Sequence, residues 1–535
     1  MGLLQEGPSR QAARRPEAVA LVFDDEAMTY GELEAESNRL ARMLRAAGCE
    51  RGDRVALVIP KSPYAIVAIL GVLKAGGIYV PVDVANPAPR IARILARSGA
   101  KWALAGRGAE KTLGEALSSP ELETTAQVGW LEAEPPAGEL LRPIFTRKDF
   151  AAASAEAIAS AGSATDAAHI LFTSGSTGEP KGVVIRHANV LHFIEWAIAY
   201  FGIGPDDRHS GHPPLHFDLS TFDIFGTLTA GAQLHLVRPE LNLIPTALAT
   251  FIRRHELTQW FSVPSILTYM AKFDVIQDGD FPTLRRLLWC GEVFPTPPLI
   301  HWMKKLPHVS FTNLYGPTEA TIASSYHTLS QCPDHEEQPI PIGRALPGEE
   351  LLVLTDDLGP TAAGEIGNLY IRGAGLSPGY WRDPEKTAAV FIPNPDDPAD
   401  RLYRTGDLAK VGEDGLVNYV GRSDSQIKSR GYRIELGEIE TALHALPGLL
   451  ESAVVGVEMG GFEGKVICCA YVVSPEADAA PSRLRRQLAA SLPSYMLPSR
   501  WMALPMLPKN ANGKVDRRAL AEAFARGPDA ARAEA

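Results

Sequence analysis

The chain has 535 residues, of which 45% are hydrophobic and 21% charged, and its formal net charge is −11. This length exceeds what one hydrophobic core usually supports, so at least two domains are expected. The acidic balance, without an obviously basic face, argues against nucleic acid as a partner.

Cysteine usage and apolar runs bear on the cellular compartment. The five cysteines are irregularly spaced and form no C-x-x-C pair, so neither a disulfide framework nor a structural zinc site is expected. No apolar run approaches the roughly 20 residues that a membrane span needs. The N-terminus lacks the apolar region of a signal peptide. We therefore expect a cytoplasmic protein without membrane contact.

The N-terminal region, residues 1–165, alternates between helical and short apolar segments. The patterns predict a helix over Tyr30–Ala47 and buried strands over Arg54–Ile59 and Gly77–Val82. Such alternation is typical of parallel sheets covered by helices. Residues 107–165 are rich in alanine and weakly patterned, and we expect them to form a variable surface region.

The strongest local pattern is Ile170-Leu-Phe-Thr-Ser-Gly-Ser-Thr-Gly-Glu-Pro-Lys-Gly182. An apolar strand leads into a loop in which glycines let the backbone approach an anion, while hydroxyl and N–H groups donate to phosphate oxygens. An amphipathic helix with Val190, Phe193 and Ala197 on one face is expected to follow. A plain Ser/Gly surface turn is the alternative, which the order of the residues disfavours. The NTPase pattern G-x-x-x-x-G-K-[ST] occurs nowhere.

The pattern of expected helices and strands changes after Asp424. A helix over about Glu435–His444, strands over Ser452–Val457 and Val466–Val473, and a helix over roughly Ser482–Ser491 are expected. Together they predict a compact α+β unit of about 110 residues that could fold as its own domain.

The phosphate loop and a series of further motifs resemble, in their order along the chain, those of the adenylate-forming superfamily. This superfamily contains acyl-CoA synthetases, luciferases and the amino-acid adenylation domains of nonribosomal peptide synthesis. Beside the phosphate loop, the resemblance rests on Met28–Leu33, Leu73–Asp83, Asn313–Glu319, Gly364–Gly373, Tyr403–Leu408, Gly421–Lys428, Leu492–Pro498 and Asn512–Arg517. It implies an α/β fold with a large N-terminal domain, 1–423, of stacked αβ subdomains plus a β-barrel-like part. A small, mobile α+β domain, 424–535, is expected to follow.

The resemblance implies ATP and Mg²⁺ as cofactors. It assigns catalytic roles to Lys514, Thr318, Glu319 and Lys181, with Glu319 as the metal ligand. The implied ATP-binding residues are Thr173, Ser174, Gly175, Ser176, Thr177, Gly178, Gly291, Glu292, Asn313, Tyr315, Gly316, Asp407, Arg422 and Lys514. Adenylation brings two anions together, so cations and aimed donors are needed.

Individual roles follow from the chemistry of the side chains. Tyr315 offers an aromatic face to adenine, against which Gly316 allows close packing. The Asp407 carboxylate can accept hydrogen bonds from both ribose hydroxyls. In isolation, Asp407 and Arg422 would be read as a surface ion pair and Glu319 as an acid at a helix N-terminus.

The resemblance also implies a moving small domain. Asp424 would be its hinge, although an ordinary Asx turn in a linker is the plain alternative. Lys514 would point inward for adenylation, and rotation would then bring the Gly431-Tyr432 segment to line a tunnel for a pantetheine thiol.

Asp218 decides the expected substrate class. It aligns with the aspartate that pairs with the α-amino group in amino-acid adenylating enzymes, while a helix N-cap is the alternative. The other implied pocket residues are Leu219, Phe222, Ser262, Leu288, Cys290, Leu314, Ile322 and Ala323. Because only Asp218 and Lys514 bring charge to this pocket, we expect a small or medium, neutral, aliphatic amino acid. Cys290 has no His–acid partner in the sequence and is not expected to be a nucleophile.

No carrier domain is recognisable after Asp516-Arg517. We therefore expect a freestanding, monomeric ligase of the D-alanine–carrier protein ligase type, which loads a separate phosphopantetheinylated carrier protein. Two rivals remain open: an acyl- or aryl-CoA ligase of the same fold, and a catalytically silent member that acts as a binding protein.

Overall fold

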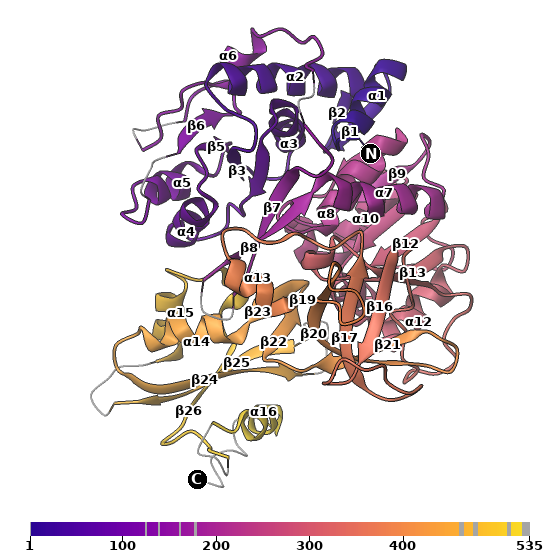
Figure 1. The fold of residues 1–535 in the computed structure, drawn as a ribbon, viewed down its shortest axis with the longest axis vertical. Coiled ribbons are helices and arrows are strands. Elements are labelled where there is room, and N and C mark those ends of the chain that lie inside the picture. Colours follow the sequence, from indigo (N-terminus) through magenta and orange to yellow (C-terminus); the bar gives the residue numbers. More distant parts are fainter. Residues whose placement is uncertain are drawn as a thin grey trace.

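The computed structural model describes residues 2–122, 126–136, 140–159, 162–175, 179–459, 465–474, 480–510 and 515–526. Figure 1 shows a large N-terminal region that contains several sheets, with a small α+β region below it. This arrangement confirms the expected α/β class with one large and one small domain. Within the described ranges, no helix has the length and apolarity needed to cross a membrane. All five cysteines are free thiols.

A seven-stranded sheet, in the order β18-β8-β7-β4-β3-β5-β6, forms the first layer. Its strands are β3 (Arg54–Val58), β4 (Ile78–Pro81), β5 (Trp102–Ala105), β6 (Gln127–Trp130), β7 (Ala167–Thr173), β8 (Lys181–Arg186) and β18 (Gly379–Tyr380). Its helices are α2 (Tyr30–Ala46), α3 (Pro63–Ala75), α4 (Ala88–Ser98), α5 (Glu110–Leu117) and α6 (Arg147–Ala151). Val55 and Leu57 of β3 pack with α2 and α3, whereas Ala56 and Val58 pack with α4 and α5. Both faces are therefore covered, which explains why the predicted strands are apolar throughout.

A nine-stranded sheet, in the order β15-β14-β13-β12-β11-β9-β10-β1-β2, forms the second layer. Its strands are β1 (Val19–Phe23), β2 (Glu26–Thr29), β9 (Arg208–Gly211), β10 (Gln233–Leu236), β11 (Gln259–Ser262), β12 (Arg286–Trp289), β13 (Ser310–Tyr315), β14 (Ser325–Thr328) and β15 (Arg344–Ala345). Its helices are α1 (Glu6–Arg14), α7 (His187–Phe201), α8 (Leu219–Thr221), the π-helix η1 (Phe222–Gly226), α9 (Thr227–Ala230), η2 (Pro239–Leu243), α10 (Pro245–Arg254), α11 (Pro264–Lys272) and α12 (Thr296–Lys305). Phe261 and Leu288 face the core shared with the first layer, and Trp260 and Trp289 face α10–α12.

Two sequence predictions are wrong in detail. Residues 107–165 are not merely a surface region, because β6 joins the first sheet and Trp130 and Phe150 are buried. The helix α7 does not directly follow the phosphate loop, because β8 intervenes and pairs antiparallel with β7. Both misses involve elements too short for their period to stand out in the sequence.

An antiparallel sheet connects the large region to the small one. It contains β16 (Glu349–Leu354), β17 (Gly367–Gly373), β19 (Phe391–Pro393), β20 (Arg401–Val411) and β21 (Val417–Arg422), with α13 (Pro384–Val390) beside it. The register pairs Asp407 of β20 with Arg422 of β21. The chain leaves this sheet at Arg422, just before Asp424, the expected hinge, and then enters the small region.

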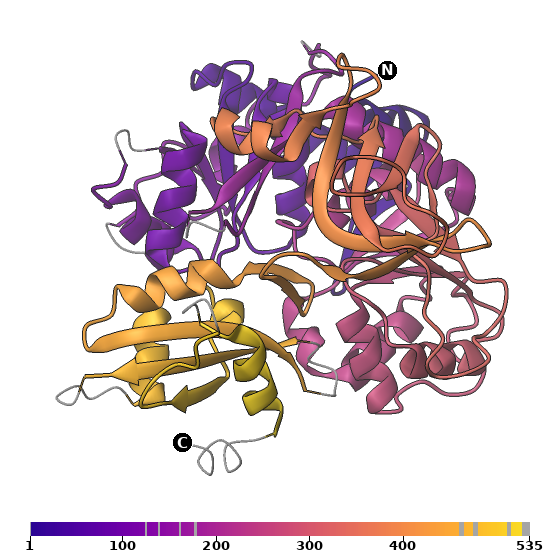
Figure 2. The same cartoon turned by 60° about the horizontal axis from the view of Figure 1, so that its bottom comes forward.

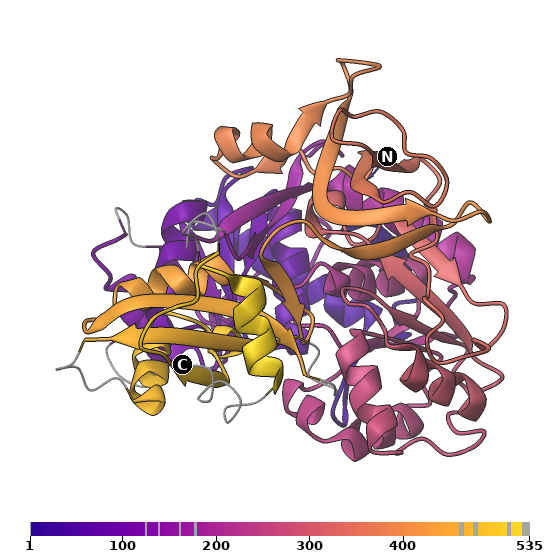
Figure 3. The same ribbon diagram turned by 90° about the horizontal axis from the view of Figure 1, so that it is seen from below.

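The small region is built around the sheet β24-β25-β26. Its elements are β22 (Gln426–Ser429), β23 (Tyr432–Glu435), α14 (Leu436–His444), β24 (Leu449–Glu458), β25 (Lys465–Val473), α15 (Pro481–Leu488), η4 (Ser494–Met496), β26 (Arg500–Ala503) and α16 (Arg517–Arg526). Cys469 faces the core with α14, α15 and the β22–β23 hairpin, while Cys468 faces the core with α16. Figures 2 and 3 show α16, in yellow, against this sheet. The two faces of the β24-β25-β26 sheet are therefore covered by different segments.

Candidate active site

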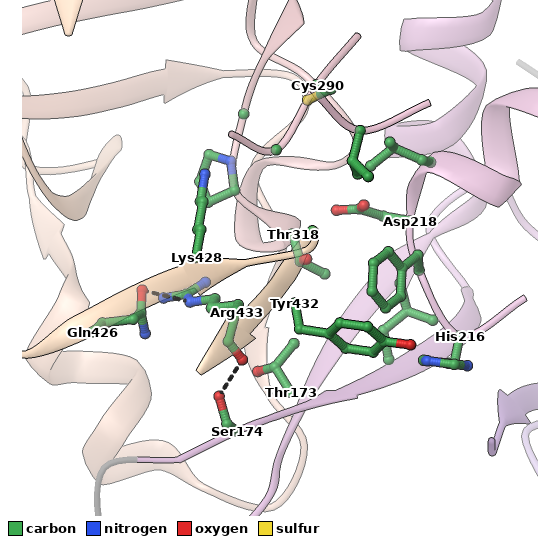
Figure 4. Close-up of a pocket in the computed structure, with 18 of the residues that line it drawn as sticks. Thr173, Ser174, His216, Asp218, Cys290, Thr318, Gln426, Lys428, Tyr432 and Arg433 are labelled. Carbon is green, nitrogen blue, oxygen red and sulfur yellow. Dashed lines mark hydrogen bonds between the residues drawn. The ribbon is translucent and has the colours of Figure 1, made fainter. Parts of the chain in front are cut away.

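A cleft lies where the β22–β23 hairpin meets loops at the carboxyl ends of β7, β11, β12 and β13 (Figure 4). Open α/β sheets bind ligands at this edge. The predicted site residues that line the cleft are Thr173, Ser174, Asp218, Leu219, Cys290, Gly291, Gly316, Thr318, Asp407, Arg422 and Gly431. Tyr432, expected beside Gly431 in the pantetheine tunnel, lines the cleft too. Lining residues that the sequence did not single out are Leu171, Phe172, His216, Phe217, Val263, Pro317, Gln426, Lys428, Arg433 and Tyr495.

The described start of the phosphate loop faces the hairpin. The Thr173 hydroxyl is buried and has no hydrogen-bond partner among the described residues. The Ser174 hydroxyl donates to the Arg433 carbonyl at 2.7 Å and accepts from the Glu435 N–H at 3.3 Å. Three predicted loop residues, Ser176, Thr177 and Gly178, lie outside the described residues. The Thr173 hydroxyl is thus available to donate to an anion.

Glu319 is the most enclosed charged group near the cleft. It lies in the short helix η3 (Thr318–Ala320) and its side chain is fully buried. Arg433 Nη1 lies 2.6 Å from its Oε2, and Tyr380 donates to its Oε1 at 2.7 Å. Lys181 Nζ lies 3.3 Å from Oε1. Although burial opposes ionisation, Arg433 and Lys181 hold the pKa of Glu319 well below its usual value, so the carboxylate is charged.

The expected ribose and adenine residues form one connected chain. The Tyr315 hydroxyl donates to Asp407 Oδ2 at 2.5 Å, and Arg422 Nη1 donates to Oδ1 at 2.6 Å. Arg422 also reaches Asp424 at 2.6 Å. Asp407 and Arg422 therefore form an ion pair, but it is buried, whereas the alternative interpretation was a surface ion pair. The Lys428 ammonium lies 5.9 Å from the centre of the Tyr315 ring.

Asp424 also forms the Asx turn that was the alternative to a hinge. Its Oδ1 accepts from the Gln426 N–H at 3.0 Å, which is an Asx-type contact. This contact leaves a hinge role open, because such a turn can sit at a pivot.

Gly316 is required for a reason other than the expected one. An added Cβ there would lie 2.5 Å from the Ala323 Cα, so the glycine allows two backbone segments to meet. Between them, Thr321 and Ile322 adopt positive φ angles of 58° and 71°. The Thr321 hydroxyl donates to the Gly375 carbonyl at 2.7 Å and helps to hold this strained turn.

Asp218 lies in the wall of the cleft immediately before α8. Although it occupies the N-cap position, its side chain accepts no capping hydrogen bond, which removes the main alternative to a binding role. Burial raises its pKa to about 6, while a hydrogen bond from Thr318 opposes this shift. No salt bridge joins Asp218 to a cation among the residues that the structure describes, so this buried carboxylate is suited to receive one.

The other expected substrate residues are buried in the large region. Leu219, Phe222, Leu288, Cys290, Leu314, Ile322 and Ala323 belong to one core cluster. Only Leu219 and Cys290 of these line the cleft. Burial raises the pKa of the Cys290 thiol to about 12, which agrees with its expected lack of nucleophilic activity. Ser262 is buried, and its hydroxyl accepts from the Trp260 indole at 3.1 Å.

Two predicted ATP-binding residues make contacts within the protein. Glu292 accepts the Ser265 N–H at 3.0 Å and the Gly431 N–H at 2.8 Å, and so joins α11 to the hairpin turn. Asn313 donates to the Pro341 carbonyl at 2.9 Å and does not line the cleft.

The hairpin turn fits closely against the large region. Gly431 has a φ of +79°, and an added Cβ would lie 2.6 Å from a methyl of Val263, so both conformation and space require glycine. The Tyr432 ring meets Phe217 edge-on at 5.0 Å and stacks on Tyr495 at 3.8 Å. Tyr432 belongs to the segment that the resemblance assigns to the pantetheine tunnel, whereas Tyr495 lies in a motif of the resemblance but was assigned no role.

The expectation that only Asp218 and Lys514 bring charge to the substrate end is wrong. Lys428 of β22 lines the same cleft, and it lowers the pKa of both Asp218 and Cys290 against the larger effect of burial. Lys428 is 210 positions from Asp218 in the printed sequence, so only the folded arrangement reveals that they share a cleft.

Lys514 lies outside the described residues. Among its described neighbours, Val515 pairs with Lys509 and packs beside Leu507 and α16. This core is on the opposite face of the small sheet from the core of the β22–β23 hairpin.

Comparison with known proteins identifies the family. Residues 8–381 match the AMP-binding enzyme family, and residues 438–514 match the AMP-binding enzyme C-terminal domain. The chain is 35% identical over 531 residues to an L-proline--[L-prolyl-carrier protein] ligase of Pseudomonas fluorescens, covering 97% of this chain and 99% of that protein. It is 37% identical over 510 residues to tyrocidine synthase 3 of Brevibacillus parabrevis, covering 95% of this chain but 7% of that much longer protein.

A solved structure shows the same architecture. The adenylation domain AlmE of Vibrio cholerae, in complex with glycyl-adenosine-5'-phosphate, matches with a TM-score of 0.82 and 25% identity over 98% of each chain. The family match spans most of the large region and much of the small region. The chain therefore belongs to the family of AMP-binding enzymes, as a member of the adenylate-forming superfamily.

Proposed function

We propose that this protein is an AMP-forming ligase. It activates an amino acid with ATP as an aminoacyl-adenylate and transfers the aminoacyl group to the phosphopantetheine thiol of a separate carrier protein. The observation that carries the proposal is Asp218, a buried carboxylate in the same cleft as Thr318 and Thr173. An α-ammonium group in an enclosed pocket needs a counter-ion, whereas a fatty or aryl acid does not. The similarity to the L-proline--[L-prolyl-carrier protein] ligase of Pseudomonas fluorescens supports the same amino-acid and carrier-protein chemistry.

In the first half-reaction, a carboxylate oxygen attacks the α-phosphorus of ATP. A new P–O bond forms, the bond to the β-phosphate oxygen breaks, and pyrophosphate leaves. Thr318 and the phosphate loop are suited to donate hydrogen bonds to phosphate oxygens, and Lys181 adds positive charge beside them. We assign to Lys514 the neutralisation of charge on the carboxylate and the α-phosphate.

The nucleoside would lie against the Tyr315 face, with its ribose hydroxyls at Asp407. Arg422 holds Asp407 at 2.6 Å and would keep it oriented. We also propose that Gly291, Glu292 and Asn313 contribute to ATP binding.

The carboxylate of Glu319 is suited to be one ligand of a Mg²⁺ ion whose other ligands would come from the substrate phosphates. The described residues contain no cluster of three or more His, Cys, Asp or Glu side chains that could cage a metal. Mg²⁺ commonly takes one or two carboxylates together with substrate phosphates, and Glu319 is a charged, hard oxygen donor. When bound, the ion would supply positive charge to the phosphates. The Glu319 oxygens also accept from Arg433 and Tyr380, and a bound cation would weaken the attraction between Glu319 and Arg433.

We further propose that residues 1–423 and 424–535 are two domains that move about Asp424. The present arrangement suits the second half-reaction, because Gly431 and Tyr432 line the cleft while Val515, next to Lys514, packs on the far face of the small sheet. In that half-reaction the pantetheine thiol sulfur attacks the acyl carbon, a C–S bond forms, and AMP leaves. Adenylation would require the small domain to rotate and bring Lys514 inward.

The apolar character of the expected substrate residues supports a small or medium, neutral amino acid. Leu219 and Cys290 line the cleft with Asp218, and Phe222 and Leu314 are bulky and buried.

Amino-acid-dependent exchange of pyrophosphate into ATP tests the proposal. The panel should contain L-Ala, D-Ala, L-Pro and β-amino acids beside fatty and benzoic acids. Exchange with an amino acid supports the proposal, whereas exchange only with fatty or benzoic acids would make the protein an acyl- or aryl-CoA ligase. No exchange with any acid would favour the silent binding protein. Phosphopantetheinylated carrier protein and coenzyme A should then be compared as acceptors.

A further inference from the structure

A buried ion pair joins the large and the small region beside the cleft. Arg90 Nη1 lies 2.5 Å from Oε1 of Glu438, and the two side chains are only 4% and 1% exposed. Arg90 belongs to α4 of the large region and Glu438 to α14 of the small region. Arg93 on the same face of α4 adds a second contact, donating to the Ser491 carbonyl at 3.1 Å. The pair is therefore an interface contact between segments 348 residues apart.

Glu438 depends on Arg90 for charge balance. Burial raises the pKa of Glu438, and Arg90 is the strongest influence that opposes this rise. Glu438 Oε2 accepts no hydrogen bond from the portion of the chain that the structure describes. A buried charge that loses its partner costs far more than a surface charge, which simply remains hydrated. Docking of the small region is thus favourable with both residues present and costly when either is missing.

The pair is connected to the wall of the cleft. Tyr495 interacts with Arg90 through its hydroxyl and stacks on Tyr432 with ring centres 3.8 Å apart. Tyr432 in turn packs edge-on against Phe217 at 5.0 Å. Tyr432 and Tyr495 both line the cleft, so the position of Arg90 and Glu438 bears directly on the hairpin that closes it.

We propose that Arg90 and Glu438 are positioning residues that hold the small domain in the orientation for thioester formation. The inference rests on the proposed function and its two half-reactions. Rotation about Asp424 would separate the two side chains and let water hydrate each one. They would therefore stabilise one orientation only, and act on thioester formation but not on adenylation.

The test compares Arg90→Gln, Glu438→Gln and the double variant with the wild type in the full chain. Arg97→Gln is the matched control, since Arg97 lies on the same helix but contacts Glu179 and Asp383 of the large region. Pyrophosphate exchange measures adenylation, and thioester formation with free pantetheine measures the second step, both with the amino acid that exchanges best. Nitroxides at Lys111→Cys and Arg486→Cys, in a Cys332→Ser background, report the distance between the domains.

Each single variant should lower thioester formation about tenfold or more, because one buried charge is left alone. Pyrophosphate exchange of each single variant should stay within about threefold of the wild type. The double variant should form the thioester no more slowly than the slower single variant, because the two side chains are coupled. The nitroxide distance should leave its wild-type value in both single variants and keep it in Arg97→Gln. An unchanged ratio of the two half-reactions, or an unchanged distance, overturns the proposal. Should the wild type exchange with no amino acid, the proposed function fails, while the distance measurement still decides the role of the pair.

Discussion

The guanidinium of Arg433 lies 2.6 Å from the carboxylate of Glu319, which is fully buried. A residue of the small region thus supplies the nearest positive charge to the carboxylate that we propose as a metal ligand. Lys181 is the second cation, at 3.3 Å. Arg433 and the proposed metal ion would therefore both be attracted to the same carboxylate, which would couple the orientation of the small domain to the contents of the cleft.

Replacing Arg433 tests this contact through stability. In Arg433→Gln, Glu319 keeps Lys181 as its one charged partner within the described ranges, and removing one member of a buried ion pair costs about 3 kcal/mol. The free energy of unfolding, from denaturant titration at neutral pH, should fall by about this amount. Arg486→Gln, at an exposed position of α15, is the control and should change it by less than about 0.5 kcal/mol. Equal effects of the two substitutions would show that Glu319 does not depend on Arg433.

Asp218→Asn should abolish amino-acid activation. The amide keeps the shape of the side chain but cannot balance an α-ammonium group, so pyrophosphate exchange should fall about 100-fold or more. ATP affinity, measured by calorimetry without amino acid, should change by less than about threefold, since Asp218 is not assigned to the nucleotide. Unchanged exchange in this variant would contradict the assigned position of the substrate.

The same substitution should make the protein more stable, in a pH-dependent way. The carboxyl of Asp218 has a pKa at its usual 3.8 when unfolded and at about 6 when folded, mainly because it is buried. As pH rises through this window the unfolded state loses its proton first, so the wild type loses stability. Asp218→Asn avoids this loss, with a gain of about 2–3 kcal/mol at pH 7.5 and less than about 1 kcal/mol at pH 4. Unfolding curves at both pH values check the sign. A gain of equal size at pH 4 would assign the effect to packing instead.

The elements of the fold that the sequence predicts are those whose signals are local. The helix at Tyr30 begins there because Thr29 and Glu32 form a capping box, and both residues are adjacent to it in sequence. Here a short pattern contains the groups that determine where the helix begins.

The contacts missed from the sequence are those made between distant segments. Ser174 meets the backbone of Arg433 across 259 positions, and Arg433 meets Glu319 across 114. Periodicity reports which face of a segment is apolar, but not which remote hairpin will cover it. Lys428 and Tyr495 were missed for this reason, although both lie in motifs that define the family.

Gly431→Ala should impair the second half-reaction more than the first. The residue has a φ of +79°, and the added methyl carbon would lie 2.6 Å from Val263, so the hairpin turn cannot keep its place. Thioester formation with pantetheine should fall at least about tenfold more than pyrophosphate exchange. Adding Val263→Ala removes the clash but not the backbone strain, and should restore only some of the rate. Equal loss in both half-reactions would contradict a specific role of this turn in the tunnel.

Lys514→Ala should remove adenylation while sparing transfer from an adenylate that is already formed. The ammonium group is proposed to neutralise charge that develops as the carboxylate attacks ATP, and removal of one such group typically slows a reaction about 100–1,000-fold. Single-turnover pyrophosphate release measures this step, and pantetheine added to isolated aminoacyl-adenylate measures the next. Lys509→Ala is the matched control, because Lys509 lies five positions earlier and pairs with Glu451 at 2.5 Å on the surface. Full-speed pyrophosphate release from Lys514→Ala would remove the basis for a rotating small domain, since no group would then need to leave the cleft between the two half-reactions.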